Sequence, residues 1–152
     1  MTKYLIGLLL VPTLGFAGEC PYLMGHYRNC HSEIKEMKGE YVVEQSNEKG
    51  VEVYAIKYID EDGSIQEDEF KTDGSTTTRK QKIPTIGINV KVVGNAVCDE
   101  NNVVSKGNAY YAGVNVGSFD TTIFKTEDDT LTMKIKAQYL GKTVNKLIQC
   151  KE

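Results

Sequence analysis

The chain has 152 residues, of which 26% are charged and 40% are hydrophobic, and its formal net charge is -3. These values are typical of one soluble globular domain and exclude a disordered chain, which would be poorer in apolar residues. The acidic balance gives no electrostatic reason to expect a nucleic acid as partner. It gives equally little reason to expect binding to an anionic membrane.

The first residues have the order of a secretory signal peptide. Lys3 precedes an apolar run at 5–11, and small residues follow, ending at Ala17. A charged start, a short apolar stretch and small residues before a cleavage site are the signature of export. The apolar run is too short for a permanent membrane anchor. We therefore expect a signal peptide at 1–17 and a single exported domain at 18–152. The sequence has no Asn-x-Ser/Thr sequon, which favours a bacterial periplasmic or secreted protein.

Four cysteines, Cys20, Cys30, Cys98 and Cys150, lie beyond the expected cleavage site. In an oxidising compartment, an even number of cysteines predicts disulfide bonds. Of the three possible pairings we favour Cys20 with Cys30, because the segment between them can close a local loop, which leaves Cys98 to pair with Cys150. The chain has no C-x-x-C motif and no zinc-finger spacing, so we interpret the cysteines as structural.

The composition beyond the signal peptide favours strands over helices. Valine, isoleucine, threonine and tyrosine are frequent, whereas leucine and alanine are scarce. Apolar and polar residues alternate most clearly at 130–139, and shorter alternations occur at 53–58 and 86–93. This period of two predicts strands with one buried face.

Turn signals rich in glycine, asparagine and aspartate separate these runs, for example at 46–50, 60–63 and 140–142. Their spacing predicts an all-β domain, a single antiparallel meander of about eight to ten strands that forms a small closed or nearly closed barrel. A β-sandwich is the alternative. The polar stretch at 74–82 is either a solvated edge strand or a mobile loop.

The side chains of Tyr54, Ile56 and Tyr58 would share one face of a strand. If that face points into the barrel, the rings and hydroxyls are candidate contacts for a small apolar or amphipathic ligand. The alternative is that they only fill the interior, because a small barrel has little spare room.

Gly25-His26-Tyr27 follows a short Cys-Pro segment. It resembles the Gly-x-Trp motif that opens the barrel of lipocalins and their calycin relatives, with Tyr27 in place of tryptophan. The chain has no counterpart to the family's Thr-Asp-Tyr turn. The resemblance implies a lipocalin-like barrel and carries no specific activity.

A second motif implies a different function. Ser105-Lys106-Gly107-Asn108-Ala109-Tyr110, followed by Phe124-Lys125-Thr126, resembles segments of bacterial periplasmic lysozyme inhibitors. In that family a loop and a nearby polar residue enter the lysozyme cleft. The resemblance implies an inhibitory loop with Ser105, Lys106 and Tyr110 as its candidate residues.

Catalytic and metal-binding patterns are weak. His26 and His31, the only histidines, have an odd separation and would lie on opposite faces of one strand. The acidic run at 60–69 lacks the residue order of an EF-hand, and we interpret it as a solvated hairpin. We find no nucleophile, phosphate-loop or dinucleotide motif. We therefore expect a non-enzymatic binding protein without metal or cofactor, whose partner is a small apolar ligand or a protein.

Overall fold

The computed structural model describes residues 19–33, 38–83 and 87–152, so the expected signal peptide at 1–17 lies outside the described residues. The described chain is all-β, as predicted. Its strands are β1 (Gly25–Ser32), β2 (Glu40–Glu48), β3 (Val51–Ile59), β4 (Ile65–Lys71), β5 (Thr77–Ile83), β6 (Ile88–Asp99), β7 (Asn102–Tyr111), β8 (Val114–Lys125), β9 (Thr130–Tyr139) and β10 (Lys142–Lys151).

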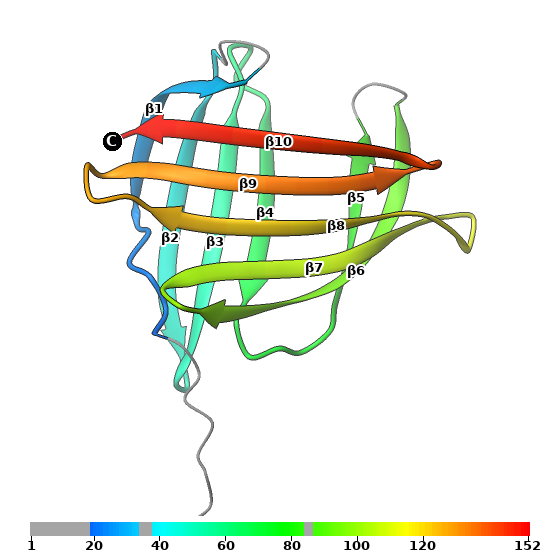
Figure 1. Ribbon diagram of the computed structural model, residues 1–152, viewed down its shortest axis with the longest axis horizontal. Helices are drawn as coiled ribbons and strands as arrows, with labels where there is room; N and C mark the ends of the chain where they lie inside the picture. Colours follow the sequence, from blue (N-terminus) through cyan, green and yellow to red (C-terminus); the bar gives the residue numbers. More distant parts are fainter. Residues whose placement is uncertain (1–18, 34–37, 84–86) are drawn as a thin grey trace, which may run out of the picture.

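These strands form one antiparallel sheet in the order β4-β3-β2-β1-β10-β9-β8-β7-β6-β5 (Figure 1). Each strand except the two edges pairs with its neighbours along the chain, and β1 also pairs with β10. The sheet is strongly curled into a half-barrel, which confirms the predicted meander. Its edges are β4 and β5, which follow each other in the sequence. The polar stretch predicted as an edge strand or a loop therefore contains an edge strand, β5.

The predicted alternation is confirmed in the second part of β9, where Lys134, Lys136 and Gln138 are exposed and the residues between them are half-buried. In the first part it is wrong, because Thr130 and Thr132 are buried together with Leu131 and Met133 at the packed end. In β3, Tyr54 and Ile56 are buried on the same face. A period of two directs alternate side chains into the curl, and near the packed end residues of the other face, such as Val53, are buried too.

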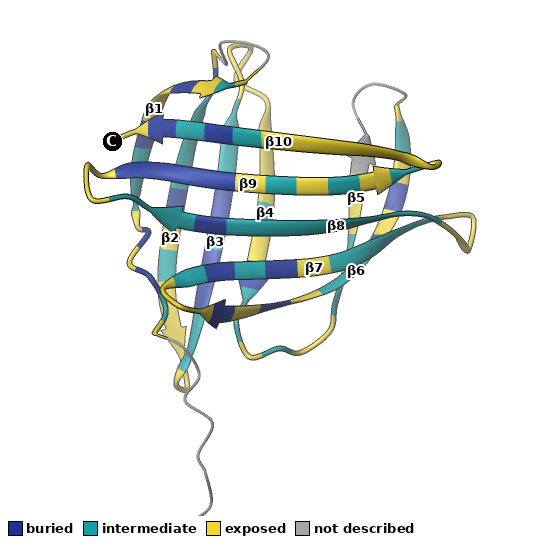
Figure 2. Cartoon of the chain, viewed as in Figure 1, coloured by how far each residue is buried: buried dark blue, intermediate teal, exposed yellow. Residues whose placement is uncertain are grey.

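The packed core occupies one end of the half-barrel. Figure 2 shows buried residues concentrated where β9 leaves the β8–β9 turn, whereas the β9–β10 turn at the opposite end is exposed. The core includes Leu23, Tyr27, Val43, Tyr54, Val103, Ile123, Leu131 and the disulfide-bonded Cys30 and Cys150. One end of the curled sheet is thus filled with side chains.

The segment before β1 closes this packed end. The hydroxyl of Tyr54 donates a hydrogen bond to the carbonyl oxygen of Pro21 at 2.6 Å, and the hydroxyl of Tyr27 donates to that of Leu23 at 2.7 Å. The amide of Leu23 donates to Oε1 of Gln45 at 2.9 Å. Buried hydroxyls require such partners, so the two tyrosines fix the path of the N-terminal segment.

The predicted disulfide pairing is wrong. Cys20 is bonded to Cys98, and Cys30 is bonded to Cys150, with Cα–Cα distances of 5.0 and 4.1 Å. The chain is extended through β1, so Cys20 and Cys30 are carried apart rather than closed into a local loop. Because β1 pairs with β10, Cys30 instead lies beside Cys150. Two disulfides are typical of a non-reducing, extracellular environment.

Candidate functional site

A cavity of about 750 Å³ lies inside the curl of the sheet, beyond the packed core. Most of its lining is apolar and comes from both halves of the meander. The apolar lining includes Ile56, Phe70, Val90, Val92, Phe119, Ile123, Met133, Ile135, Ala137 and Ile148. Polar side chains are fewer and include Gln66, Asp68, Arg79, Gln81 and Lys146.

Two tyrosines form one wall of the cavity. The rings of Tyr41 on β2 and Tyr58 on β3 are opposite each other in the register, with centroids 4.9 Å apart. Burial raises the pKa of both hydroxyls, so both stay protonated at neutral pH. A Cβ atom at Gly39 would lie 2.5 Å from the ring of Tyr58. The missing side chain at Gly39 therefore makes the room in which the Tyr58 ring lies.

The seam between the edge strands borders the cavity. Arg79 of β5 lies with its Nε 3.0 Å from Oδ1 of Asp68 of β4. The charges of Arg79 and Asp68 are thus in contact, but within the described part of the chain Nε of Arg79 makes no hydrogen bond of good geometry. The guanidinium also lies over the rings of Phe70 and Phe119, 5.5 and 5.9 Å from their centroids. Cation–π contacts and the ion pair together hold the arginine at the seam.

Two glycines make room for Phe119. Gly94 and Gly107 are opposite each other on β6 and β7, and Gly107 is also opposite Phe119 of β8. A Cβ atom at Gly107 would lie 2.7 Å from the ring of Phe119. The aromatic ring therefore covers bare backbone and reaches Arg79.

The structure separates the three predicted ligand contacts. Ile56 and Tyr58 line the cavity, together with Tyr41. Tyr54 is fully buried in the packed core, and its hydroxyl is hydrogen-bonded to the carbonyl of Pro21. Tyr54 therefore fills the interior, as the alternative prediction had it. Ile56 and Tyr58 border the open volume of the cavity.

The expected inhibitory loop is a strand. Ser105, Lys106 and Tyr110 all lie in β7, which is paired on both sides, with β6 and with β8. Ser105 is buried, and Lys106 forms an ion pair with Asp120 at 3.5 Å. A strand paired on both sides cannot extend into the cleft of an enzyme as a free loop would, so the geometry gives no support to this alternative.

The two histidines are apart from the cavity. Nε2 of His26 lies 2.9 Å from Oε2 of Glu40, and His31 is exposed. In residues 19–33, 38–83 and 87–152, no group of three histidine, cysteine, aspartate or glutamate side chains has the geometry of a metal site. Over the same residues, no helix is long and apolar enough to cross a membrane.

Sequence reasoning missed the residues of the seam. In the sequence Asp68 belongs to an acidic run and Arg79 to a polar stretch, and neither pattern reveals that β4 and β5 are the two edges of one curled sheet. The opposite charges of these consecutive segments were the one available signal.

No protein-family model matches the chain, and no curated protein is significantly similar to it.

Proposed function

We propose that this chain is an exported, non-enzymatic binding protein that holds a small apolar or amphipathic ligand in the interior of its half-barrel. The observation that carries the proposal is the apolar cavity of about 750 Å³. Small-molecule sites are usually concave, have volumes of about 300–1,000 Å³, and combine an apolar lining with a few polar groups.

The distribution of polar groups favours an amphipathic ligand. The deeper wall carries Ile123, Met133 and Ile148, which offer only apolar contact. Asp68 and Arg79 lie at the seam, where a polar group of the ligand would remain near water. A ligand with an apolar body in the deeper part of the cavity and a polar group at the seam would therefore match the apolar wall and the charged pair.

Rigidity of the scaffold supports binding without chemistry. The disulfide between Cys30 and Cys150 ties β1 to β10, and the one between Cys20 and Cys98 ties the N-terminal segment to β6. A pre-formed cavity loses little conformational entropy when a ligand enters. The cavity lining contains no histidine or cysteine, and its one carboxylate, Asp68, is paired with Arg79.

The direct test fills the cavity. Ala137 lines it on β9, so Ala137→Phe places a ring in the open volume. Ala55 lies on the opposite face of β3 from the buried Tyr54 and Ile56, so Ala55→Phe is the matched control. The probe is 1-anilinonaphthalene-8-sulfonate, whose fluorescence rises in apolar surroundings.

We expect saturable binding of one probe molecule to the wild type and to Ala55→Phe. Ala137→Phe should weaken binding about tenfold or more, which corresponds to about 1.4 kcal/mol. Thermal unfolding of all three proteins checks that the fold is kept. Equal probe affinity in all three folded proteins would refute the cavity as the binding site.

Export is a separate part of the proposal. It is supported by the apolar segment at 5–11 and by two disulfides, which persist in oxidising compartments. Expression of the full chain in a bacterium, followed by N-terminal sequencing of the periplasmic and secreted fractions, should give a protein that begins at Gly18. An unprocessed chain confined to the cytoplasm would contradict export.

A further inference from the structure

The net charge of the whole chain hides a strong local separation. No aspartate or glutamate occurs at 102–119 or at 130–151. The second of these ranges contains Lys134, Lys136, Lys142, Lys146 and Lys151. The strands β7, β9 and β10 and the first part of β8 therefore form a basic region in an acidic protein.

Two neighbouring hairpins at one end of this basic region expose apolar side chains. On the β7–β8 hairpin, Tyr111 is 48% and Val114 is 64% exposed; on the β9–β10 hairpin, Leu140 is 71% and Val144 is 53% exposed. The amide of Leu140 donates a hydrogen bond to the carbonyl of Val116, so the two hairpins are adjacent.

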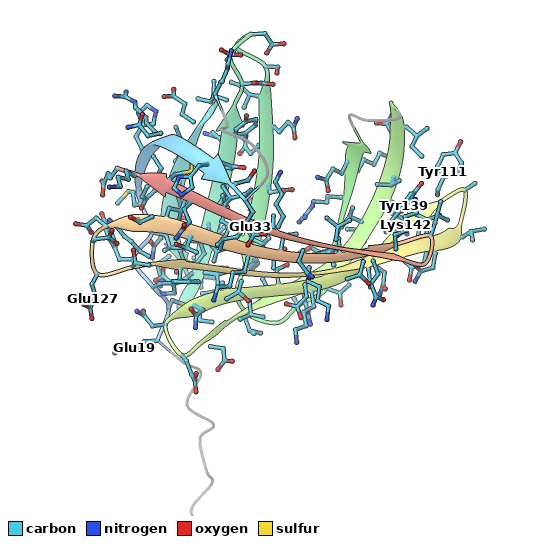
Figure 3. All side chains as sticks on the ribbon, turned by 45° about the horizontal axis from the view of Figure 1, so that its top comes forward. Glu19, Glu33, Tyr111, Glu127, Tyr139 and Lys142 are labelled. Carbon is cyan, nitrogen blue, oxygen red and sulfur yellow. A yellow bond between two sulfur atoms is a disulfide. The ribbon has the colours of Figure 1, made fainter. Side chains whose placement is uncertain are left out.

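We call these two hairpin ends, residues 110–116 and 139–144, the tip surface. Figure 3 shows Tyr111, Tyr139 and Lys142 together at this end of the sheet, while Glu19 and Glu127 lie at the opposite end. Tyr139 is opposite Lys142 in the register that closes the β9–β10 hairpin. Apolar, aromatic and basic side chains thus share one end of the molecule.

The first acidic residue along β8 beyond the tip surface is Asp120. Asp120 forms an ion pair with Lys106 on the neighbouring strand. Asp120 also borders a shallow hollow farther along the sheet, together with Glu33, Lys134 and Lys136. Lys142 is therefore the one charged residue of the tip surface, which has no acidic residue of its own.

We propose that the tip surface binds peripherally to an anionic lipid bilayer. Leu140, Val114 and Tyr111 enter the headgroup region, and Lys142 contacts lipid phosphates. Aromatic rings and the long stems of lysine suit this interface, because each combines an apolar body with a polar end. This surface goes beyond the proposed ligand binding and does not depend on it.

The shape favours a bilayer over a protein partner. The apolar side chains lie at the ends of two projecting hairpins and not on one flat patch, so they suit shallow insertion into lipid. Tyr139 and Lys146 also line the interior cavity, so its lining reaches this end. A protein held here by a bilayer would have its cavity next to a source of amphipathic molecules.

The test measures binding of the purified, disulfide-bonded protein to sedimented vesicles. One set contains phosphatidylcholine alone, and the other contains phosphatidylcholine with phosphatidylglycerol. Leu140 has a positive φ of 46°, which asparagine tolerates, so the test variant is Leu140→Asn combined with Val114→Thr. Ile65→Thr is the control, because Ile65 is 61% exposed but follows the acidic β3–β4 turn.

We expect the wild type and Ile65→Thr to bind the phosphatidylglycerol vesicles more tightly than the neutral ones, and binding to fall as salt is raised. The double variant should bind about tenfold more weakly. Lys142→Glu should also lower binding to the anionic vesicles. Equal binding to both vesicle types, no binding to either, or undiminished binding of the double variant would overturn the proposal. A further outcome would favour a protein partner and overturn the proposal. In it, the wild type binds a soluble envelope protein but no vesicles, and the double variant loses that protein binding.

Discussion

Asp68 and Arg79 connect the two edge strands of the sheet, with Oδ1 and Nε 3.0 Å apart. β4 and β5 share no ladder of backbone hydrogen bonds, since each is paired on one side only. The segment between them is tied by backbone contacts to other strands: Asp73 bridges Val97 of β6, and the amide of Gly74 donates to the carbonyl of Ala96. Side chains therefore hold the seam that borders the cavity.

Breaking this ion pair should speed exchange of a ligand more than it lowers stability. For Asp68→Asn we expect faster dissociation of an uncharged apolar dye in stopped-flow measurements; an anionic dye would be held by the freed charge of Arg79. The free energy of unfolding should fall by less than about 1 kcal/mol, because the pair is partly solvated. Glu44→Gln removes the pair that Lys57 forms with Glu44 and serves as control. Equal dissociation rates in the two variants would show that the seam does not control access.

Tyr54 and Tyr58 should respond differently to the same substitution. Tyr54→Leu removes a fully buried ring and its bond to Pro21, so it should lower the free energy of unfolding by about 2–4 kcal/mol. Tyr58→Leu should change probe affinity with a smaller loss of stability, because its ring borders open volume. Urea unfolding and probe titration of both variants distinguish the roles. The reverse pattern would contradict the placement of the cavity.

Alkaline pH should weaken the packed end. Burial raises the pKa of Tyr54 and Tyr27 above the ordinary value of 10.0. A raised folded-state pKa means that the stabilisation is complete below about pH 10 and is lost as the pH rises toward the folded-state value. Urea midpoints should therefore fall from pH 9 to pH 11.

Tyr54→Phe provides the control for this pH dependence. It should be less stable than the wild type at pH 8, because the Pro21 carbonyl loses its donor. Its stability should, however, fall less steeply above pH 10. An identical slope in the two proteins would exclude Tyr54 as a source of the alkaline loss.

The disulfides can be tested by peptide mapping without reduction. We expect linked peptides that contain Cys20 with Cys98 and Cys30 with Cys150. In the chain-entropy model, loops of 78 and 120 residues correspond to about 4.5 and 5 kcal/mol when each bond is taken alone. Cys30→Ser with Cys150→Ser should therefore lower the urea midpoint substantially. A peptide that links Cys20 to Cys30 would contradict the fold around β1 and β10.

The sequence predicted the strands because alternation with a period of two is a local property. The burial of Leu131 and Met133 can be predicted from the residue pattern alone, without knowing which strand pairs with them. The pairing of Cys30 with Cys150 depends instead on the contact between the first and last strands. Nothing local encodes that contact, so a preference for short loops led to the wrong pairing.

The candidate site was predicted only in part for a similar reason. Tyr54 and Tyr58 share a face but lie four residues apart, about 13 Å along a strand. That distance separates the packed end from the cavity, and sequence periodicity does not show where a core stops. The residue order at 130–151 shows lysines without any acidic residue, whereas the net charge of -3 averages this stretch with the acidic strands.

Native mass spectrometry of the protein expressed in a bacterium and purified without denaturation tests ligand binding most directly. The account predicts a mass above that of the disulfide-bonded chain by one small molecule, which organic extraction releases and identifies as apolar or amphipathic. For Ala137→Phe, a smaller fraction of the protein should carry this added mass. For Ala55→Phe, the fraction should equal that of the wild type. A wild-type protein that carries only its own mass, and that takes up no molecule from a lipid extract of the expressing cells, would contradict the account.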